Sequence, residues 1–543
     1  MRNKLLLTIL SVSLFAQGSN WNAGLYSKYG DGEQDGNPYD YLENYLILNA
    51  NEGNWLFSLE LDYNFPPEYG TEHSGIRTYN LQYLGEQLSF ELGQVSSVIG
   101  NGLSLNLFDD KTIDFDNRPV GMKIQYDINE NWQTTTLFGF KQNYHFYSPS
   151  ANIRTPDGNN AYTLGGAQIH YFPDDGSWGF TPYIIGSRFK SDIIWKELAF
   201  ENLETQSDTL SQYSSVINPG FVFSVYENRW DGVLEISANQ KRFDKPFIRQ
   251  NNDDENLTIS ESLTQQNGNA IYSQVNWYPE WFTLTAEYKR YAWNVASDDN
   301  KKNLYRQAFY PLPYQMGPTG IRQHDIGLLG NITHPVDYSD EVGVFVELKK
   351  DFDYALATFS YVSASRIQNG DIVSEQLWFP SQNLGYYPFI EYYAELETSG
   401  ETINNRSVIA FTKLSTDGNL WEQHITFTPF YASWSIKDNF VLNLVSTIQL
   451  SHRGEEQYKS QQYISSVDFG SKLSLAGILD ISDDLELVGD GQWLSGEITF
   501  KPKSSMWIRA SYGKEKGGVR CTSGVCRIIS PFEGFRLAME IRL

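Results

Sequence analysis

The chain has 543 residues, 15% of them aromatic, two cysteines and a formal net charge of −25. Its mean hydropathy is −0.43. After the first twenty residues no apolar run approaches the ~20 residues that a membrane helix needs, which excludes a bundle of membrane helices. The acidic balance also argues against nucleic acid as a partner.

The first residues predict export. Two basic residues open the chain, an apolar core follows over Leu5–Phe15, and Ala16-Gln17-Gly18 is a small-x-small cleavage site. This pattern is typical of a secretory signal peptide, and its apolar core is too short to span a membrane. We therefore predict a signal peptide over residues 1–18 and a single structural domain over residues 19–543.

From Trp21 onward, apolar residues recur at every second position, which is the period of a strand with one apolar and one polar face. The final strand illustrates it. Its apolar face carries Phe535, Leu537, Met539, Ile541 and Leu543, and its polar face carries Arg536, Ala538, Glu540 and Arg542. High aromatic content, polar average composition and such strands favour a membrane β-barrel, in which half of each strand faces a polar interior. An array of soluble β-sandwiches is the alternative.

The turns separate these two interpretations. Tyr226-Glu227-Asn228-Arg229-Trp230 and Tyr278-Pro279-Glu280-Trp281 each place an aromatic residue on both sides of a tight polar turn. Rings gathered at one level of a sheet are typical of a membrane-interface girdle. The same position at or near a strand start is held by Trp55, Trp132, Trp178, Trp230, Trp281 and Trp507.

Long polar stretches alternate with the short turns. The expected long loops are residues 30–40, 96–118, 143–161, 191–210, 242–268, 294–341 and 366–385. Short periplasmic turns and long extracellular loops are the outer-membrane arrangement. The prediction is an all-β fold: a single large antiparallel transmembrane β-barrel of about 24 strands, within a range of roughly 20 to 26. It implies location in the cell outer membrane, with lipid and the barrel-assembly machinery as partners.

Three short motifs carry a narrower resemblance. They are Gly100-Asn101-Gly102 with the run to Asp110, Gly317-Pro318 with Arg322-Gln323-His324, and the C-terminal Cys521-Thr522-Ser523-Gly524-Val525-Cys526-Arg527. The chain resembles Gram-negative outer-membrane barrels in general, and it looks like an uncharacterised exported barrel family with a Cys-x-x-Gly-Val-Cys-Arg segment before the last strand. It departs from the usual pattern by ending on Leu543 rather than on an aromatic residue. The resemblance implies fold and location, but no activity.

Cys521 and Cys526 lie five residues apart in a chain predicted to be exported, so they can form a disulfide within one loop. The closed loop is small, and we expect stabilisation toward the low end of ~2–4 kcal/mol. No histidine lies nearby to complete a metal site. We predict a disulfide here and no metal.

Residues 96–118 are the first candidate for a functional loop. A porin-like constriction would fold this loop inward against a basic wall, which Arg509, Arg536 and Arg542 could supply from the lumen face that also carries Glu540. An exposed acidic loop is the simpler alternative, and the spacing of an EF-hand is absent. The candidate residues of the loop are Asp109, Asp110, Asp114, Asp116 and Arg118.

Residues 294–341 form the longest expected loop, and loops of this length are usually functional or disordered. The aromatic and proline-rich run over 309–314 favours packing, either within the lumen as a plug or over its mouth as a cap. Arg322, His324 and His334 are the candidate residues beyond this run. Two histidines without a third ligand do not define a metal site.

Catalysis is not expected. Seven histidines are scattered along the chain, and no Gly-x-Ser-x-Gly nucleophile elbow occurs. The favoured function is a channel or transporter of polar solutes, narrowed or gated by inward-folded loops, without a cofactor and with small polar or cationic solutes as cargo. The alternative is a surface receptor or scaffold sealed by its own loops, and a barrel hydrolase is the least favoured interpretation.

Overall fold

The structure is a computed structural model. The residues that it describes are 20–34, 36–68, 72–111, 115–142, 161–198, 205–251, 258–293, 312–330, 332, 334, 336–367, 376–416, 418–437, 439–484, 491–522, 525–529 and 531–542. The predicted signal peptide and Asp114 lie outside them.

Among the described residues, 24 strands form one antiparallel sheet, and every strand contacts the next along the chain. Their bounds are β1 Trp21–Gln34, β2 Asn37–Glu52, β3 Trp55–Asn64, β4 His73–Leu84, β5 Leu88–Gln94, β10 Val120–Asp127, β11 Trp132–Gln142, β12 Ala161–Tyr171, β13 Trp178–Leu198, β14 Thr205–Glu227, β15 Trp230–Asn251, β16 Thr258–Trp277, β17 Thr283–Ala292, β18 Asp340–Phe352, β19 Ala355–Ser365, β20 Phe389–Ser399, β21 Ile403–Leu414, β22 Glu422–Lys437, β23 Phe440–Arg453, β24 Glu456–Phe469, β25 Leu473–Ser482, β26 Gln492–Lys503, β27 Met506–Glu515 and β30 Phe532–Arg542.

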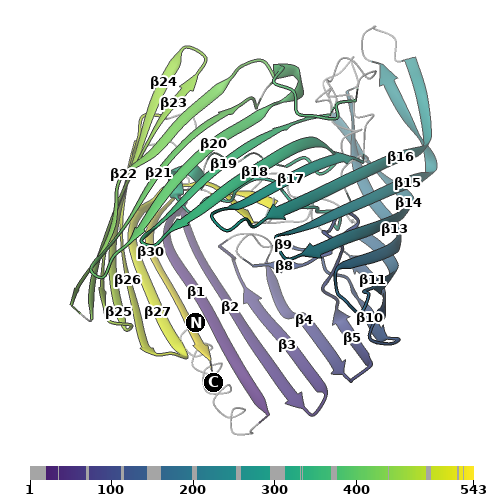
Figure 1. Ribbon diagram of the computed structural model, residues 1–543, viewed down its shortest axis with the longest axis horizontal. Coiled ribbons are helices and arrows are strands. Elements are labelled where there is room, and N and C mark those ends of the chain that lie inside the picture. Colours follow the sequence, from purple (N-terminus) through teal and green to yellow (C-terminus); the bar gives the residue numbers. More distant parts are fainter. Residues whose placement is uncertain are drawn as a thin grey trace.

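The last strand closes the sheet onto the first. Strand β30 pairs with β27 on one side and with β1 on the other, where Gly24 lies opposite Arg542 and Gln34 lies opposite Phe532. The sheet curves round on itself in Figure 1, and the ladder has no free edge. The predicted closed barrel of about 24 strands is confirmed.

The two faces of the strands differ as period two requires. On β26, Leu494, Ile498 and Phe500 point outward and are 65%, 44% and 45% exposed, whereas Trp493 and Ser495 point inward and are buried. Among the described residues, no helix is long and apolar enough to cross a membrane. A closed barrel with an apolar outer face satisfies its backbone internally and contacts lipid, so this is a transmembrane barrel of the outer-membrane type.

Aromatic rings gather at the end of the barrel where the tight turns lie. Trp55 contacts Tyr83 and Phe90 with ring centroids 5.1 and 5.5 Å apart, and Trp132 contacts Tyr171 at 4.6 Å. These contacts agree with the predicted girdle, because outward aromatic side chains of neighbouring strands meet at one level.

Trp507 differs from the rest of the predicted girdle, because its side chain faces the lumen. Its indole nitrogen donates a hydrogen bond to Glu540, 2.7 Å away, and its ring lies against Tyr26.

Three predicted long loops are wrong in extent. Residues 30–40 form a tight hairpin, because β1 continues to Gln34 and β2 begins at Asn37. In the ranges 191–210 and 242–268, strands β13 to β16 continue through most of the sequence. Outside the membrane neither face of a strand has to be apolar, so the apolar alternation used for prediction ends before the strand does. The predicted loop at 143–161 lies almost wholly outside the described residues.

Two segments fold into the barrel. The first inner segment, residues 96–111 and 115–118, contains the short strands β6 (Ser97–Ile99), β7 (Leu105–Leu107), β8 (Asp109–Asp110) and β9 (Phe115–Asp116), of which β8 and β9 are labelled in Figure 1. The second inner segment, residues 312–330, 332, 334 and 336–339, contains helix α3 (Gly327–Gly330).

A separate hairpin of β28 (Gly518–Thr522) and β29 (Val525–Ile529) lies beside α3. Its backbone register places Cys521 directly opposite Cys526. The two side chains lie outside the described part of the chain, and the disulfide therefore stays a prediction.

Candidate functional site in the barrel lumen

The first inner segment is anchored to the lumen wall by apolar packing. Ile99, Leu105 and Leu107 are almost fully buried in one cluster with the inward-facing Tyr162 and Ile185. Burial of each such side chain contributes on the order of 1.5–3 kcal/mol. The segment is thus a packed part of the core and not a solvated loop, and the simpler alternative of an exposed acidic loop is wrong for its described residues.

Asn117 joins the two inner segments. Its Oδ1 accepts a hydrogen bond from the Phe108 backbone at 2.7 Å, and its Nδ2 donates to the carbonyls of Asn106 at 2.7 Å and Pro313 at 2.9 Å. The Asn106 backbone N–H also donates to the Tyr314 carbonyl at 2.7 Å. Asn117 is 1% exposed, so each lost bond would leave a buried polar group unpaired.

The acidic residues of the first inner segment meet cations of the wall. Asp109 lies 3.5 Å from Arg77 of β4 and 3.4 Å from Arg118, and Asp116 lies 3.0 Å from Arg118 and 3.5 Å from Lys141 of β11. Asp110 is half-buried beside them in β8. The structure thus brings together the described aspartates and Arg118, with wall partners that sequence analysis did not identify.

The two paired aspartates differ in acidity. Burial raises the pKa of Asp109 above its ordinary value, and the nearby Arg118 only partly offsets this. Burial has the same tendency at Asp116, but Lys141 and Arg118 outweigh it and lower the pKa of this carboxyl. Asp116 receives three hydrogen bonds from Arg118, which favour its charged form.

The four predicted wall residues near the C-terminus face the lumen, but their ion pairs are made elsewhere. Arg509 pairs with Glu497 at 3.3 Å, and Arg536 pairs with Glu515 and with Glu68. Arg542 pairs with Glu540. Each arginine pairs with a carboxylate on its own strand, on a neighbouring strand or on the adjoining loop. The ion pairs of the described residues include none between these arginines and the first inner segment.

The second inner segment crosses the lumen and is held by ion pairs. Arg322 pairs with Glu347 of β18 and, at 2.9 Å, with Glu395 of β20. Asp325 receives two hydrogen bonds from Arg406 of β21, at 2.6 and 2.9 Å. These bonds lower the pKa of Asp325, although burial acts in the opposite direction.

Both candidate histidines of this segment lie against wall carboxylates. His324 Nε2 is 2.9 Å from Glu391, and His334 Nε2 is 3.1 Å from Glu341. Glu341 also pairs with Lys289. The two histidines contact different carboxylates, and no group of three or more histidine, cysteine or acidic residues able to hold a metal occurs among the described residues.

Apolar contacts complete the anchoring of the second inner segment. Ile326 and Leu329 pack against Tyr393 and other inward residues of β20 and β21. Two strands further along the wall, Gln449 of β23 donates a hydrogen bond to the Leu328 carbonyl at 2.9 Å. The segment is therefore fastened across the lumen from β18 to β23.

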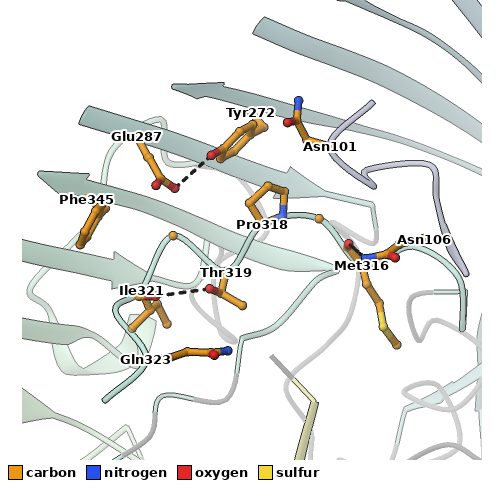
Figure 2. Close-up of a pocket in the computed structure, with 12 residues that line it drawn as sticks. Asn101, Asn106, Tyr272, Glu287, Met316, Pro318, Thr319, Ile321, Gln323 and Phe345 are labelled. Atoms are coloured by element: carbon orange, nitrogen blue, oxygen red, sulfur yellow. Dashed lines mark hydrogen bonds between the residues drawn. The ribbon is translucent and has the colours of Figure 1, made fainter. Parts of the chain in front are cut away.

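A cavity of about 360 Å³ remains between the inner segments and the wall strands β16, β17 and β18. Figure 2 shows Tyr272 and Glu287 pointing toward one another on this wall, with the phenol donating a hydrogen bond of 3.1 Å to the carboxylate. The lining residues are Asn101, Asn106, Tyr272, Glu287, Met316, Gly317, Pro318, Thr319, Gly320, Ile321, Gln323 and Phe345.

Sequence analysis missed Glu287 and Tyr272, although each occupies an inward position of the period-two pattern. It also missed Arg77 and Lys141. The pattern assigns these side chains to the lumen, but it does not distinguish them from many other inward polar residues.

Residues 20–159 match a family of unknown function, DUF6029. No curated protein matches the chain. Similar solved structures include a mutant of the ferric enterobactin receptor PfeA from Pseudomonas aeruginosa, with a TM-score of 0.48 and 7% identity over 97% of this chain and 81% of that chain. The siderophore receptor PirA from Acinetobacter baumannii has a TM-score of 0.47, 7% identity and coverage of 97% and 81%.

The copper transporter OprC has a TM-score of 0.46, 7% identity and the same coverage of 97% and 81%. At these identities and TM-scores the likeness carries no argument about function.

Proposed function

We propose that this protein is a gated outer-membrane transporter for small polar or cationic solutes. The observation that carries the proposal is the ion-paired fastening of the second inner segment to the lumen wall through Arg322 and Arg406. A barrel of this width has a lumen that must be filled or obstructed to keep the membrane tight. A segment held by charged contacts obstructs it and can also be released.

The chemistry of the lumen supports a polar cargo. Wall side chains of both charges line the passage, and carboxylates predominate on β18 and β20, where all five glutamates face inward. Such a surface lowers the energy of a cation or a hydrogen-bonding solute and disfavours an anion. The site residues proposed for this role are the paired ones, Asp109, Asp116, Arg118, Arg322, His324 and His334.

A second candidate function is a receptor sealed by its own segments. The apolar clusters around Leu105, Leu103 and Ile326 support it, because they bury the inner segments as firmly as an ordinary core. A segment held mainly by such packing would not leave the lumen, and the extracellular face would then serve a partner.

Electrical recording in planar lipid bilayers separates the two functions. We expect small, cation-selective conductance from the wild type and a several-fold larger conductance from the double variant Arg322→Met/Arg406→Met. The control is Arg229→Met, because Arg229 and Glu280 form an exposed ion pair between two turns, β14–β15 and β16–β17, with side chains 70% and 86% exposed. No conductance from either the wild type or the double variant, over a range of salt, would reject transport and favour the receptor.

A further inference from the structure

The cavity at β16–β18 has the size of a site for one small molecule. Its volume of about 360 Å³ is near the lower end of the range for ligand pockets, roughly 300–1,000 Å³. It opens between Asn101 of the first inner segment and residues 316–323 of the second. A solute bound there would contact both inner segments and the wall at once.

The glycines of the second inner segment shape this cavity. A Cβ at Gly317 would lie 2.6 Å from Leu103 Cδ2 and 2.8 Å from the Tyr291 hydroxyl, so any larger residue would require these buried side chains to move. Gly320 has a φ of +57°, which also favours glycine. The Gly317-Pro318 motif seen in the sequence therefore forms one rim of the cavity.

Glu287 is the charged group of the cavity, and it differs from the glutamates around it. Each of the five glutamates of β18 and β20 has an arginine, lysine or histidine nitrogen within 3.6 Å. Within the described part of the chain, Glu287 has no such ion pair, and its hydrogen-bond partner is the Tyr272 hydroxyl. A half-buried carboxylate with a neutral partner leaves its charge available to a ligand.

The other lining groups suit an organic molecule better than a bare ion. Polar groups come from the amides and hydroxyl of Asn101, Asn106, Thr319 and Gln323. Apolar surface comes from Met316, Pro318, Ile321 and Phe345. The lining has one carboxylate, Glu287, and so lacks the several anionic oxygens that hold a divalent metal. Lys289 lies at the rim, where its ammonium group donates to the Thr319 carbonyl and pairs with Glu341. An ammonium group with a short polar body matches the charge, the hydrogen-bonding groups and the volume.

We infer that this cavity binds a small organic cation, such as a protonated primary amine, with its ammonium group at the Glu287 carboxylate. The inference rests on the proposed function, since it names the solute class for the same lumen. Tyr272 holds the carboxylate in position by its hydrogen bond. The side-chain amides of Asn101, Asn106 and Gln323 form hydrogen bonds with the polar end of the solute.

Binding is measured by titration calorimetry on the full-length protein in detergent, with three probes of the same length. They are 4-amino-1-butanol, which is cationic at neutral pH, 1,4-butanediol, which is neutral, and 4-hydroxybutyrate, which is anionic. We expect the amino alcohol to bind and the anion not to bind. The diol should bind at least about tenfold more weakly than the amino alcohol, because the loss of one charge-assisted hydrogen bond lowers affinity by about this factor.

Glu287→Gln should weaken binding of the amino alcohol by about tenfold or more and bring it to the level of the diol. Tyr272→Phe, which keeps the charge, should weaken it by only a few-fold. Glu280→Gln is the matched control, because it removes the same charge from an exposed turn on the same hairpin. Thermal unfolding of each variant verifies that the barrel is intact.

Equal binding of the amino alcohol and the diol, or unchanged binding by Glu287→Gln, would overturn the inference. Its failure is distinct from failure of the transporter proposal, because binding in detergent requires no conduction. Selective binding with silent bilayers keeps the site and rejects transport, whereas conductance without selective binding does the reverse.

Discussion

Two arginines, one half-buried and one buried, lie on opposite sides of the barrel wall and have different partners. Arg322 is inside the lumen, where it pairs with the carboxylates of Glu347 and Glu395. Arg290 is on the outer face of β17 and is 1% exposed. Its guanidinium donates to three neutral oxygens, the Leu377 carbonyl at 3.1 Å and the Asn269 and Gln376 side chains at 2.9 Å, and it lies 4.4 Å from the ring of Trp378.

The difference follows from the medium on each side. The described end of the predicted loop at 366–385, residues 376–380, folds over the outer face, where Tyr288 donates a hydrogen bond to the Trp378 carbonyl at 2.9 Å. Under this covering, carbonyl, amide and indole groups satisfy the guanidinium, and the Asp340 carboxylate of β18 lies on the same face and interacts with it electrostatically. In the polar lumen carboxylates are tolerated, so the inner segment is held by ion pairs that pH and salt can weaken.

The largest expected effect comes from removing each guanidinium. Arg322→Met leaves two partly buried carboxylates with fewer cations, and we expect a loss of about 3 kcal/mol in unfolding free energy. Arg290→Met breaks only neutral bonds, and about 1–2 kcal/mol is expected. Urea unfolding in detergent measures both, and an equal loss would contradict the comparison. In bilayers, Arg322→Met should raise conductance and Arg290→Met should leave it unchanged.

Removing the junction between the inner segments tests whether they act as one unit. Asn117→Ala breaks three hydrogen bonds in a buried site, and we expect a loss of about 2 kcal/mol. Asn117→Asp keeps the acceptor for the Phe108 N–H but loses the amide donors, and it should be at least as destabilising. Hydrogen exchange should rise over residues 312–330 as well as 96–111, whereas residues 376–387 on the outer face should not change. A rise confined to the first inner segment would show that the two segments are independent.

Acidification should loosen the lumen but not the outer covering. Asp116 and Asp325 have pKa values below their ordinary value of 3.8. Lys141 and Arg118 stabilise the charged form of Asp116, and Arg406 stabilises that of Asp325. A carboxyl with a depressed folded-state pKa contributes stability above its unfolded pKa, and that contribution is lost as pH falls through the folded value. Conductance should therefore increase below about pH 4.

Asp109 has a raised pKa and acts in the opposite direction, so the net change is moderate. Asp325→Asn should already be more conductive at neutral pH and respond less to acid. A conductance independent of pH between 7 and 3 would contradict this account.

Salt should have the smallest effect. At ~1 M salt the Debye length is ~3 Å, and the more exposed pair of Asp325 with Arg406 should weaken. We expect faster hydrogen exchange over residues 321–330 by a few-fold, and no change at residues 376–387, whose contact with Arg290 involves neutral partners. An equal response of both regions would mean that salt acts on the barrel as a whole.

Much of the barrel follows from the sequence because each strand carries its own pattern. Period-two alternation predicts which side chains of β27 and β30 face the lumen, and Arg509, Arg536, Glu540 and Arg542 all lie there in the structure. Closure of the sheet and the approximate number of strands also follow, since lipid requires an apolar outer face and satisfied backbone groups. The loop ends were predicted poorly at residues 30–40, where this requirement no longer acts.

The partners inside the lumen were decided only by tertiary structure. Asp109 meets Arg77 and Arg118 instead of the predicted C-terminal arginines, because β4 lies beside the inward turn of the chain. Arg406 and Asp325 are separated by 81 residues, and no local period links them. Alternation determines the side of the wall on which a residue lies. The path of a loop through the lumen determines which charges become partners, and among the described residues it leaves Glu287 with the neutral Tyr272 hydroxyl.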